Sequence, residues 1–180
     1  MKKKIWGCVK DIAIVFFCAL LLSLFIKGFL IDNRLIPTSS MVPTVPVNSR
    51  ILVNRLAAFF GEPEFQDIVV FEPTETTKQE LGRSDDLLKR VIGLPGDIIL
   101  VAGGVLYRNG EAVDEPYISE PMNYTFGPVQ VPEGSVLVLG DNRNNSYDAH
   151  LWSNPFVPIK NVKGKAFFMY WPPDKFGLMD

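Results

Sequence analysis

The sequence predicts a mainly β fold class, with an antiparallel β-sheet domain behind one N-terminal transmembrane helix. Three observations support this prediction. Residues 12–26 carry no charge and are mostly apolar, and all 14 prolines of the 180-residue chain follow residue 31. Residues 1–31 hold five lysines and one aspartate, which gives them a net charge of +4. The whole chain has a net charge of −2, so residues 32–180 have a net charge of −6. Beyond residue 31, short aliphatic runs alternate with Gly, Pro, Asn and Asp, which is typical of strands and turns.

Residues 12–31 are expected to form a transmembrane anchor. Twenty helical residues span about 30 Å, which matches the hydrocarbon core of a bilayer. The single charge within them, Lys27, lies near the far end, where its long side chain can reach the headgroups. Four lysines precede the run, so the positive-inside rule places residues 1–11 in the cytoplasm and residues 32–180 outside it. The expected location is the cell (plasma) membrane, crossed once.

Two other interpretations of the apolar run are weaker. A cleavable secretory signal needs small residues spaced two apart after the run, and residues 27–36 read KGFLIDNRLI without such a pair. A buried soluble helix needs polar residues at the helical period, and none recur. Cys8 and Cys18 are the only cysteines of the sequence. Both precede the β domain, which is therefore expected to fold without a disulfide.

The remaining residues, 32–180, are predicted to form one antiparallel β domain. The runs rich in β-branched and aliphatic residues are short, as strands require. One short helical turn is expected at Leu56–Phe60. The expected strands are Arg50–Asn54, Ile68–Phe71, Leu87–Gly93, Ile98–Val101, Val105–Arg108, Val136–Leu139 and Lys163–Tyr170.

A small hairpin-rich lobe is expected near residues 100–135. Gly103-Gly104 and Asn109-Gly110 are dipeptides that favour hairpin turns. The polar stretch Thr74–Asp86 predicts a loop before this lobe. Glu115–Pro132 holds four prolines and predicts an irregular connection at its end.

A hydroxyl-rich segment lies a few residues beyond the expected anchor. Residues 36–44 read IPTSSMVPT, and the two prolines restrict the backbone on either side. Taken alone, this segment is more typical of a juxtamembrane linker than of a functional site.

One lysine interrupts an otherwise apolar strand. In residues 87–97, LLKRVIGLPGD, strand alternation puts Lys89 on one face and Arg90 on the other, so one of the two faces the core. A core-facing lysine loses hydration, which lowers its pKa toward neutrality and leaves an amine that can accept a proton. Most strand lysines instead extend to solvent.

A polar loop follows another apolar strand. Residues 140–150 read GDNRNNSYDAH, and nine of the eleven can form side-chain hydrogen bonds. The loop is either a solvated turn or a network that orients a buried amine, because buried polar groups require partners.

Together these segments resemble the sequence boxes of type I signal peptidases, the membrane-bound Ser/Lys proteases. The boxes IPTSSMVPT, ILVNR, LKRVIGLPGD and GDNRNNSYDAH occur in this order behind one N-terminal anchor, and the likeness extends through GKA at 164–166 and YWP at 170–172. Each box is a weak signal alone, whereas four in order are specific. The resemblance implies a signal-peptidase-like catalytic domain that cleaves signal peptides from exported preproteins after Ala-X-Ala-type sequences.

The resemblance also implies roles for individual residues. It makes Ser40 the nucleophile, which forms an acyl-enzyme, and Lys89 the general base. Thr38 would join the Ser40 backbone N–H in the oxyanion hole, Ser146 would orient the lysine, and Asp148 would support the site. The other matches are two structural positions, Asp141 and Arg143, and two residues that line shallow substrate pockets, Ile36 and Leu88.

Elementary chemistry is consistent with these roles. A serine hydroxyl needs a base to become nucleophilic at neutral pH, and a desolvated lysine can supply it. The oxyanion of acyl transfer needs donors, each typically worth ~3 kcal/mol. The strand that carries Lys89 can pair with an extended substrate peptide.

Three departures from the family pattern are visible. Asn48-Ser49 stand where the second box usually begins Gly-Asp, which predicts a changed turn. His150 stands where the family usually has Arg, so Asp148 would face a partner that is only sometimes charged. Trp152 is followed by Ser-Asn-Pro-Phe, which predicts an altered loop.

One rival mechanism and several rival functions remain open. Ser146, Asp148 and His150 suggest a Ser-His-Asp triad, although triad members usually come from separate segments. The function could instead be that of a narrower processing peptidase of the same superfamily, or of an inactive anchored β domain that binds partners. A Ser/Lys self-cleaving repressor is disfavoured, since the chain has an expected anchor and no DNA-binding segment.

Composition limits the partners. A net charge of −2 is unlike that of a basic nucleic-acid binder, and one histidine with two lone cysteines provides no metal-ligand set. We therefore expect preproteins and the lipid bilayer as partners, with no nucleic acid, no metal and no cofactor.

Overall fold

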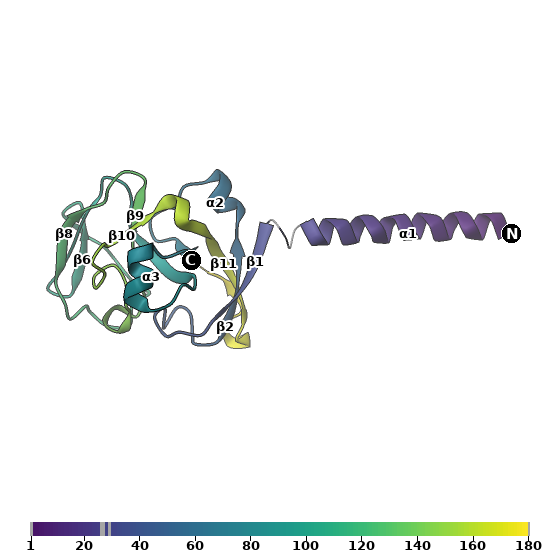
Figure 1. Ribbon diagram of the computed structural model, residues 1–180. Helices are drawn as coiled ribbons and strands as arrows, with labels where there is room; N and C mark the ends of the chain where they lie inside the picture. Colours follow the sequence, from purple (N-terminus) through teal and green to yellow (C-terminus); the bar gives the residue numbers. More distant parts are fainter. Residues whose placement is uncertain (1, 26–27, 29, 180) are drawn as a thin grey trace.

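The computed structural model describes residues 2–25, 28 and 30–179. A 24-residue helix, α1 (Lys2–Phe25), precedes a β-rich body and extends away from it in Figure 1. Among the described residues, no helix combines the length and the apolar character needed to cross a membrane. The last residue of the expected anchor, Ile31, is the first residue of strand β1 (Ile31–Ile36). The sequence analysis did not predict this strand.

Two antiparallel sheets make up the body. The larger has the strand order β1-β2-β11-β3-β4-β9-β10, with β12 beside β11, and the smaller has the order β7-β6-β5-β8. The mainly β, antiparallel prediction is therefore confirmed. The strands after β1 are β2 (Ser49–Asn54), β3 (Ile68–Phe71), β4 (Leu87–Gly93), β5 (Ile98–Ala102), β6 (Val105–Arg108), β7 (Glu111–Ala112), β8 (Phe126–Gln130), β9 (Ser135–Leu139), β10 (Phe156–Pro158), β11 (Val162–Trp171) and β12 (Gly177–Leu178).

All seven predicted strands are present, with ends that differ by at most one residue, and the helical turn α2 (Leu56–Phe60) is present as well. The two hairpin dipeptides also behave as predicted. Gly103-Gly104 and Asn109-Gly110 have positive φ at both residues, and they connect β5 to β6 and β6 to β7. The smaller sheet thus corresponds to the expected hairpin-rich lobe.

The sequence analysis was wrong about two segments. The predicted loop at 74–86 contains helix α3 (Glu75–Leu81). Thr74 caps this helix by accepting from the Thr77 N–H, and Gly82 ends it in a left-handed conformation. Local capping therefore stabilises a helix too short and too polar to show an apolar period. The predicted irregular connection at 115–132 contains β8, which pairs with β5 through contacts distant in sequence.

Asn48 explains how the chain turns into β2 without the usual glycine. Its φ is +64°, a left-handed conformation that Asn tolerates better than most residues. The Asn48 N–H donates to the carbonyl of Ile36 at 2.7 Å, which closes the loop between β1 and β2. The hydroxyl-rich segment is thereby held between two paired strands.

Two buried clusters hold the body together. One packs the smaller sheet against β4 and β9, and it includes Ile99, Val101 and Leu137, all fully buried. The other lies under the β1–β2 loop, where Met41 and Val45 are also fully buried. Ile36 belongs to the same cluster, so the chain on either side of residue 40 is anchored in the core.

Candidate active site

The loop after β1 presents Ser40 beside a buried anchor. Met41 inserts into the core, while the Val42 N–H donates to the Ser39 carbonyl at 3.1 Å and forms a tight turn. Thr44 Oγ1 donates to Asp141 Oδ2 at 2.5 Å and ties the far end of the loop to the polar loop after β9. The Ser40 hydroxyl, by contrast, lies 3.5 Å from Thr38 Oγ1 and remains half-buried.

Lys89 lies within a strand whose seven residues are all buried. Strand β3 pairs with β4 over residues 87–90, and β9 pairs with it from Arg90 onward. Only 3% of the Lys89 surface is exposed. Burial lowers the pKa of Lys89 to about 8; Arg83 also lowers it, whereas Asp148 and Asp141 oppose the shift.

Arg90, on the opposite face, is buried as well. The prediction was that one of the two cations faces the core, and in the structure both are buried. Arg90 donates through Nε and Nη2 to the two carboxylate oxygens of Asp141, at 2.9 and 2.8 Å, and through Nη1 to the carbonyl of Gln66. The Arg90 guanidinium is therefore paired with a fully buried carboxylate.

The polar loop after β9 is bound to the Ser40 loop. Asn142 donates its backbone N–H to the Ser40 carbonyl and its side-chain amide to the Ser39 carbonyl, both at 3.1 Å. Gly140 packs so closely on Ser146 and on the Ser40 carbonyl that a Cβ there would overlap both. These contacts fix the backbone that carries the Ser40 N–H.

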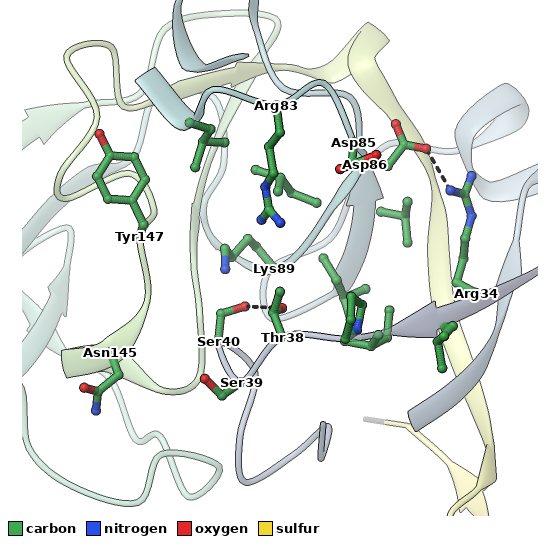
Figure 2. Close-up of a pocket in the computed structure, with 17 residues that line it drawn as sticks. Arg34, Thr38, Ser39, Ser40, Arg83, Asp85, Asp86, Lys89, Asn145 and Tyr147 are labelled. Atoms are coloured by element: carbon green, nitrogen blue, oxygen red, sulfur yellow. Dashed lines mark hydrogen bonds and ion pairs between the residues drawn. The ribbon is translucent and has the colours of Figure 1, made fainter. Parts of the chain in front are cut away.

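Ser40 and Lys89 line one cavity of about 560 Å³. Its walls are residues 34–40 of β1 and the following loop, residues 85–89 of β4 and the segment before it, and separate side chains that include Arg83, Asn145 and Tyr147. Figure 2 shows the Lys89 amine pointing toward the Ser40 hydroxyl from the opposite wall. The arrangement places a serine hydroxyl and a buried amine at the same opening.

The predicted site residues divide into two groups. Ile36, Thr38, Ser40, Leu88 and Lys89 all line the cavity. The other four lie behind it, fully or nearly fully buried: Asp141, Arg143, Ser146 and Asp148.

Ser146 and Asp148 occupy different positions in this second group. Asp148 accepts from the Gly140 N–H at 2.8 Å and acts on Lys89 through its charge. The Ser146 Oγ is buried and has no hydrogen-bond partner among the described residues. It packs directly on Gly140.

His150 contacts Asp148 and Tyr124. Its Nδ1 lies 2.7 Å from Asp148 Oδ1, and its ring stacks on Tyr124 with centroids 3.9 Å apart. The Ser146 hydroxyl forms no hydrogen bond with it, and the residue does not line the cavity. The geometry of a Ser-His-Asp triad is therefore not formed.

Several residues around the site were missed by the sequence analysis. Arg143 forms a two-pronged ion pair with Glu115, at 2.7 Å for each hydrogen bond, and Tyr117 lies between Arg143 and Arg90. Both Glu115 and Tyr117 belong to the stretch expected to be irregular, where no local pattern signals them. Arg83 was missed because it follows the unpredicted helix α3. Among the described residues, no group of three His, Cys, Asp or Glu side chains is placed to hold a metal ion.

The chain is similar to known proteins along most of its length. A family model described as "Signal peptidase, peptidase S26" matches residues 9–171. The chain is 45% identical over 161 residues to a probable signal peptidase I-2 of Synechocystis, covering 89% of this chain and 72% of that protein. It is 44% identical to a signal peptidase I of Leptolyngbya laminosa, covering 88% and 78%. It is also 39% identical to a probable thylakoidal processing peptidase 2 of Arabidopsis thaliana, covering 88% of this chain and 43% of that protein.

Proposed function

The chain belongs to the signal peptidase family, peptidase S26, and on that premise we propose how this serine peptidase cleaves signal peptides from preproteins. Ser40 is the nucleophile and Lys89 is the general base, and the reaction passes through an acyl-enzyme on Ser40. The observation that carries this proposal is the position of the Lys89 amine. It is buried in β4, is without an ion-pair partner among the described residues, and lines the same cavity as the Ser40 hydroxyl.

The pKa of Lys89 makes the amine a usable base. At a pKa of about 8, roughly a tenth of the amine is unprotonated at pH 7, against about three in ten thousand for an ordinary lysine. The neutral amine takes the proton from Ser40 Oγ as the oxygen attacks the scissile carbonyl. No histidine is required for this step.

The remaining steps follow from the same pair. The tetrahedral oxyanion receives hydrogen bonds from the Ser40 N–H and the Thr38 hydroxyl. The protonated Lys89 gives its proton to the leaving amine, so the peptide bond breaks and the acyl group stays on Ser40 Oγ. Water then attacks this ester, Lys89 accepts one of its protons, and the signal peptide leaves with a new carboxyl group while Ser40 regains its hydrogen.

The substrate lies extended against β4. Residues 87–89 of β4 pair with β3 on one edge, whereas β9 pairs with the other edge only from Arg90 onward, so that second edge has no strand beside residues 87–89. An extended peptide adds to this edge and presents its scissile bond to Ser40. Ile36 and Leu88 line the same cavity. In this proposal their branched side chains narrow the substrate pockets so that they accept small residues such as alanine. This supports cleavage after Ala-X-Ala-type sequences.

The chain is held in the plasma membrane by residues 12–31, with residues 32–180 on the extracytoplasmic side. Support comes from α1, which leaves large apolar side chains such as Val15, Phe16 and Phe17 more than half exposed, a surface that a bilayer would cover. Trp171 is half exposed on the body and is a candidate for the membrane interface. The sequence offers Phe59 and Phe60 as further candidates, and their side chains lie outside the described residues.

The topology is tested by alkaline extraction and protease protection. The full chain is expected to stay with the membrane pellet at high pH, and the body is expected to be digested by protease added to spheroplasts. Extraction into the supernatant, or protection of the body, would contradict the anchor or its orientation.

The serine assignment is tested in detergent with a preprotein that carries Ala at both key positions. Ser40→Ala is expected to leave no cleavage above background, while Ser39→Ala, a neighbouring serine in the same cavity, keeps most of the activity. Mass spectrometry of the products maps the cut. Processing by the Ser40→Ala protein would refute the central assignment.

A narrower processing peptidase is the second candidate, because one relative at 39% identity bears the name thylakoidal processing peptidase. The same preprotein separates the two. Efficient cleavage of several unrelated signal peptides supports the general activity, and cleavage of one class alone supports the specialised one.

A further inference from the structure

A second cation shares the cavity with Lys89. Arg83 follows helix α3, whose end is closed by Gly82 in the left-handed conformation and by a 3.3 Å hydrogen bond from the Arg83 N–H to the Lys78 carbonyl. This closure directs the chain back toward β4. Figure 2 shows the Arg83 side chain descending into the cavity, with its guanidinium near the Lys89 amine. The position is therefore set by a structured helix end.

The charge of Arg83 is not neutralised by a neighbour. Its side chain is exposed and forms no ion pair or hydrogen bond with any residue that the structure describes. Arg34, which lines the same cavity, instead pairs with Asp32 at 2.7 Å and with Asp86 at 3.0 Å. Asp86 is further paired with Lys163 at 2.7 Å. The charges at the outer end of the cavity are thus matched, whereas the charge nearer Lys89 is unmatched.

We propose that Arg83 is a positioning residue that acts through Lys89, holding that amine in its neutral, proton-accepting form during signal-peptide cleavage. The inference rests on the proposed role of Lys89 as general base. An unmatched positive charge beside an amine disfavours the protonated amine, which is the form that cannot accept a proton from Ser40. The charge sits on a solvent-exposed side chain, so its effect is modest and sensitive to salt.

The other groups that face Lys89 act in the opposite direction or are neutral. Asp148 and Asp141, from the loop after β9, raise the pKa of Lys89, and Arg83 is the cation that lowers it. The Ser40 loop contributes hydroxyl groups, and β3 contributes apolar residues. Tyr147 and Asp85 also line the cavity. In Figure 2 a dashed line joins Arg34 to Asp86, which is thus paired with that arginine.

The pH profile of kcat/KM tests the proposal. In Arg83→Gln the acid limb of this profile is expected to shift to higher pH by about 0.5 pH unit. The shift lowers kcat/KM about threefold at pH 7 and leaves the alkaline plateau unchanged. Arg83→Glu is expected to move it by about 1 unit, with a tenfold loss at pH 7, and Arg83→Lys keeps the wild-type profile. High salt reduces all these differences.

Arg50→Gln is the matched control. Arg50 is exposed on β2, has no ion pair among the described residues, and does not line the cavity, so its loss changes the net charge equally without moving the limb. Identical profiles for wild type and Arg83→Gln would overturn the proposal. So would an equal loss at every pH, because that indicates a direct substrate contact or a folding defect.

A measurement without catalysis separates this proposal from the dyad itself. In Ser40→Ala, NMR of labelled lysine side chains reports the titration of Lys89, with Lys89→Met identifying its signal. If the pH midpoint of the Lys89 titration rises when Arg83→Gln is added, the proposal is supported. If the midpoint does not move, the proposal is refuted. If Lys89→Met is still active, the proposed function fails independently of Arg83.

Discussion

Lys89 and Arg90 are neighbours on one strand, both buried, yet the two sides of β4 treat their charges differently. Arg90 forms a two-pronged ion pair with Asp141. Lys89 opens into a cavity, has no ion pair among the described residues, and has a pKa lowered to about 8. The difference teaches that burial alone does not make a base. A buried cation becomes a proton acceptor when no carboxylate is paired with it.

The largest expected effect comes from removing the amine on the cavity side. Lys89→Met keeps the length and apolar stem of the side chain but cannot accept a proton, so kcat/KM is expected to fall by about 10⁴-fold or more. His150→Ala is the matched test of the rejected triad and is expected to cost less than about tenfold. Rates with a purified preprotein decide the matter, and the reverse order of effects would sink the Ser/Lys dyad.

The same approach on the other side of β4 is expected to damage the fold rather than the chemistry. Arg90→Met leaves Asp141 buried with its charge unmatched, which should cost about 3–5 kcal/mol in the free energy of unfolding. Denaturant unfolding of the detergent-solubilised chain measures this loss. Adding Asp141→Asn to Arg90→Met should restore part of the stability, and no restoration would mean that the ion pair is not the cause.

The unpaired amine should make stability depend on pH. Its pKa is about 8 in the folded chain against an ordinary value of 10.5, so the unfolded chain binds more protons between these limits. Stability therefore rises with pH from about 8 to about 10.5, by about 3 kcal/mol in total. Lys89→Met should remove this rise and be the more stable protein below pH 8. Parallel curves for the two proteins would show that Lys89 is not desolvated.

The smallest effect concerns the acid behind the cavity. Asp148 raises the pKa of Lys89. Asp148→Asn should therefore shift the acid limb of the kcat/KM profile to lower pH by about 0.5 pH unit. The limb thus moves opposite to its shift in Arg83→Gln. Because Asp148 also accepts from the Gly140 N–H, the plateau rate is expected to fall as well. A limb that moves upward would contradict the assigned sign.

The local patterns of the chain are enough to predict much of this protein. Alternating aliphatic runs and hairpin dipeptides predict seven strands and two tight turns, because strand pleating and left-handed turns depend on neighbouring residues. The ordered boxes also identify Ser40 and Lys89, which share one cavity in the structure. Their catalytic roles remain predictions.

Only the tertiary structure decided how the two cations of β4 are used. Alternation places Lys89 and Arg90 on opposite faces but cannot show that both faces are buried, since that depends on the sheets and loops packed on each side. It also could not show that Asp141 pairs with Arg90, that Glu115 pairs with Arg143, or that a capped helix delivers Arg83 to the cavity. Each of these depends on a contact between distant segments. Desolvation and ion pairing are set by the surroundings in three dimensions, and they distinguish a base from a structural cation.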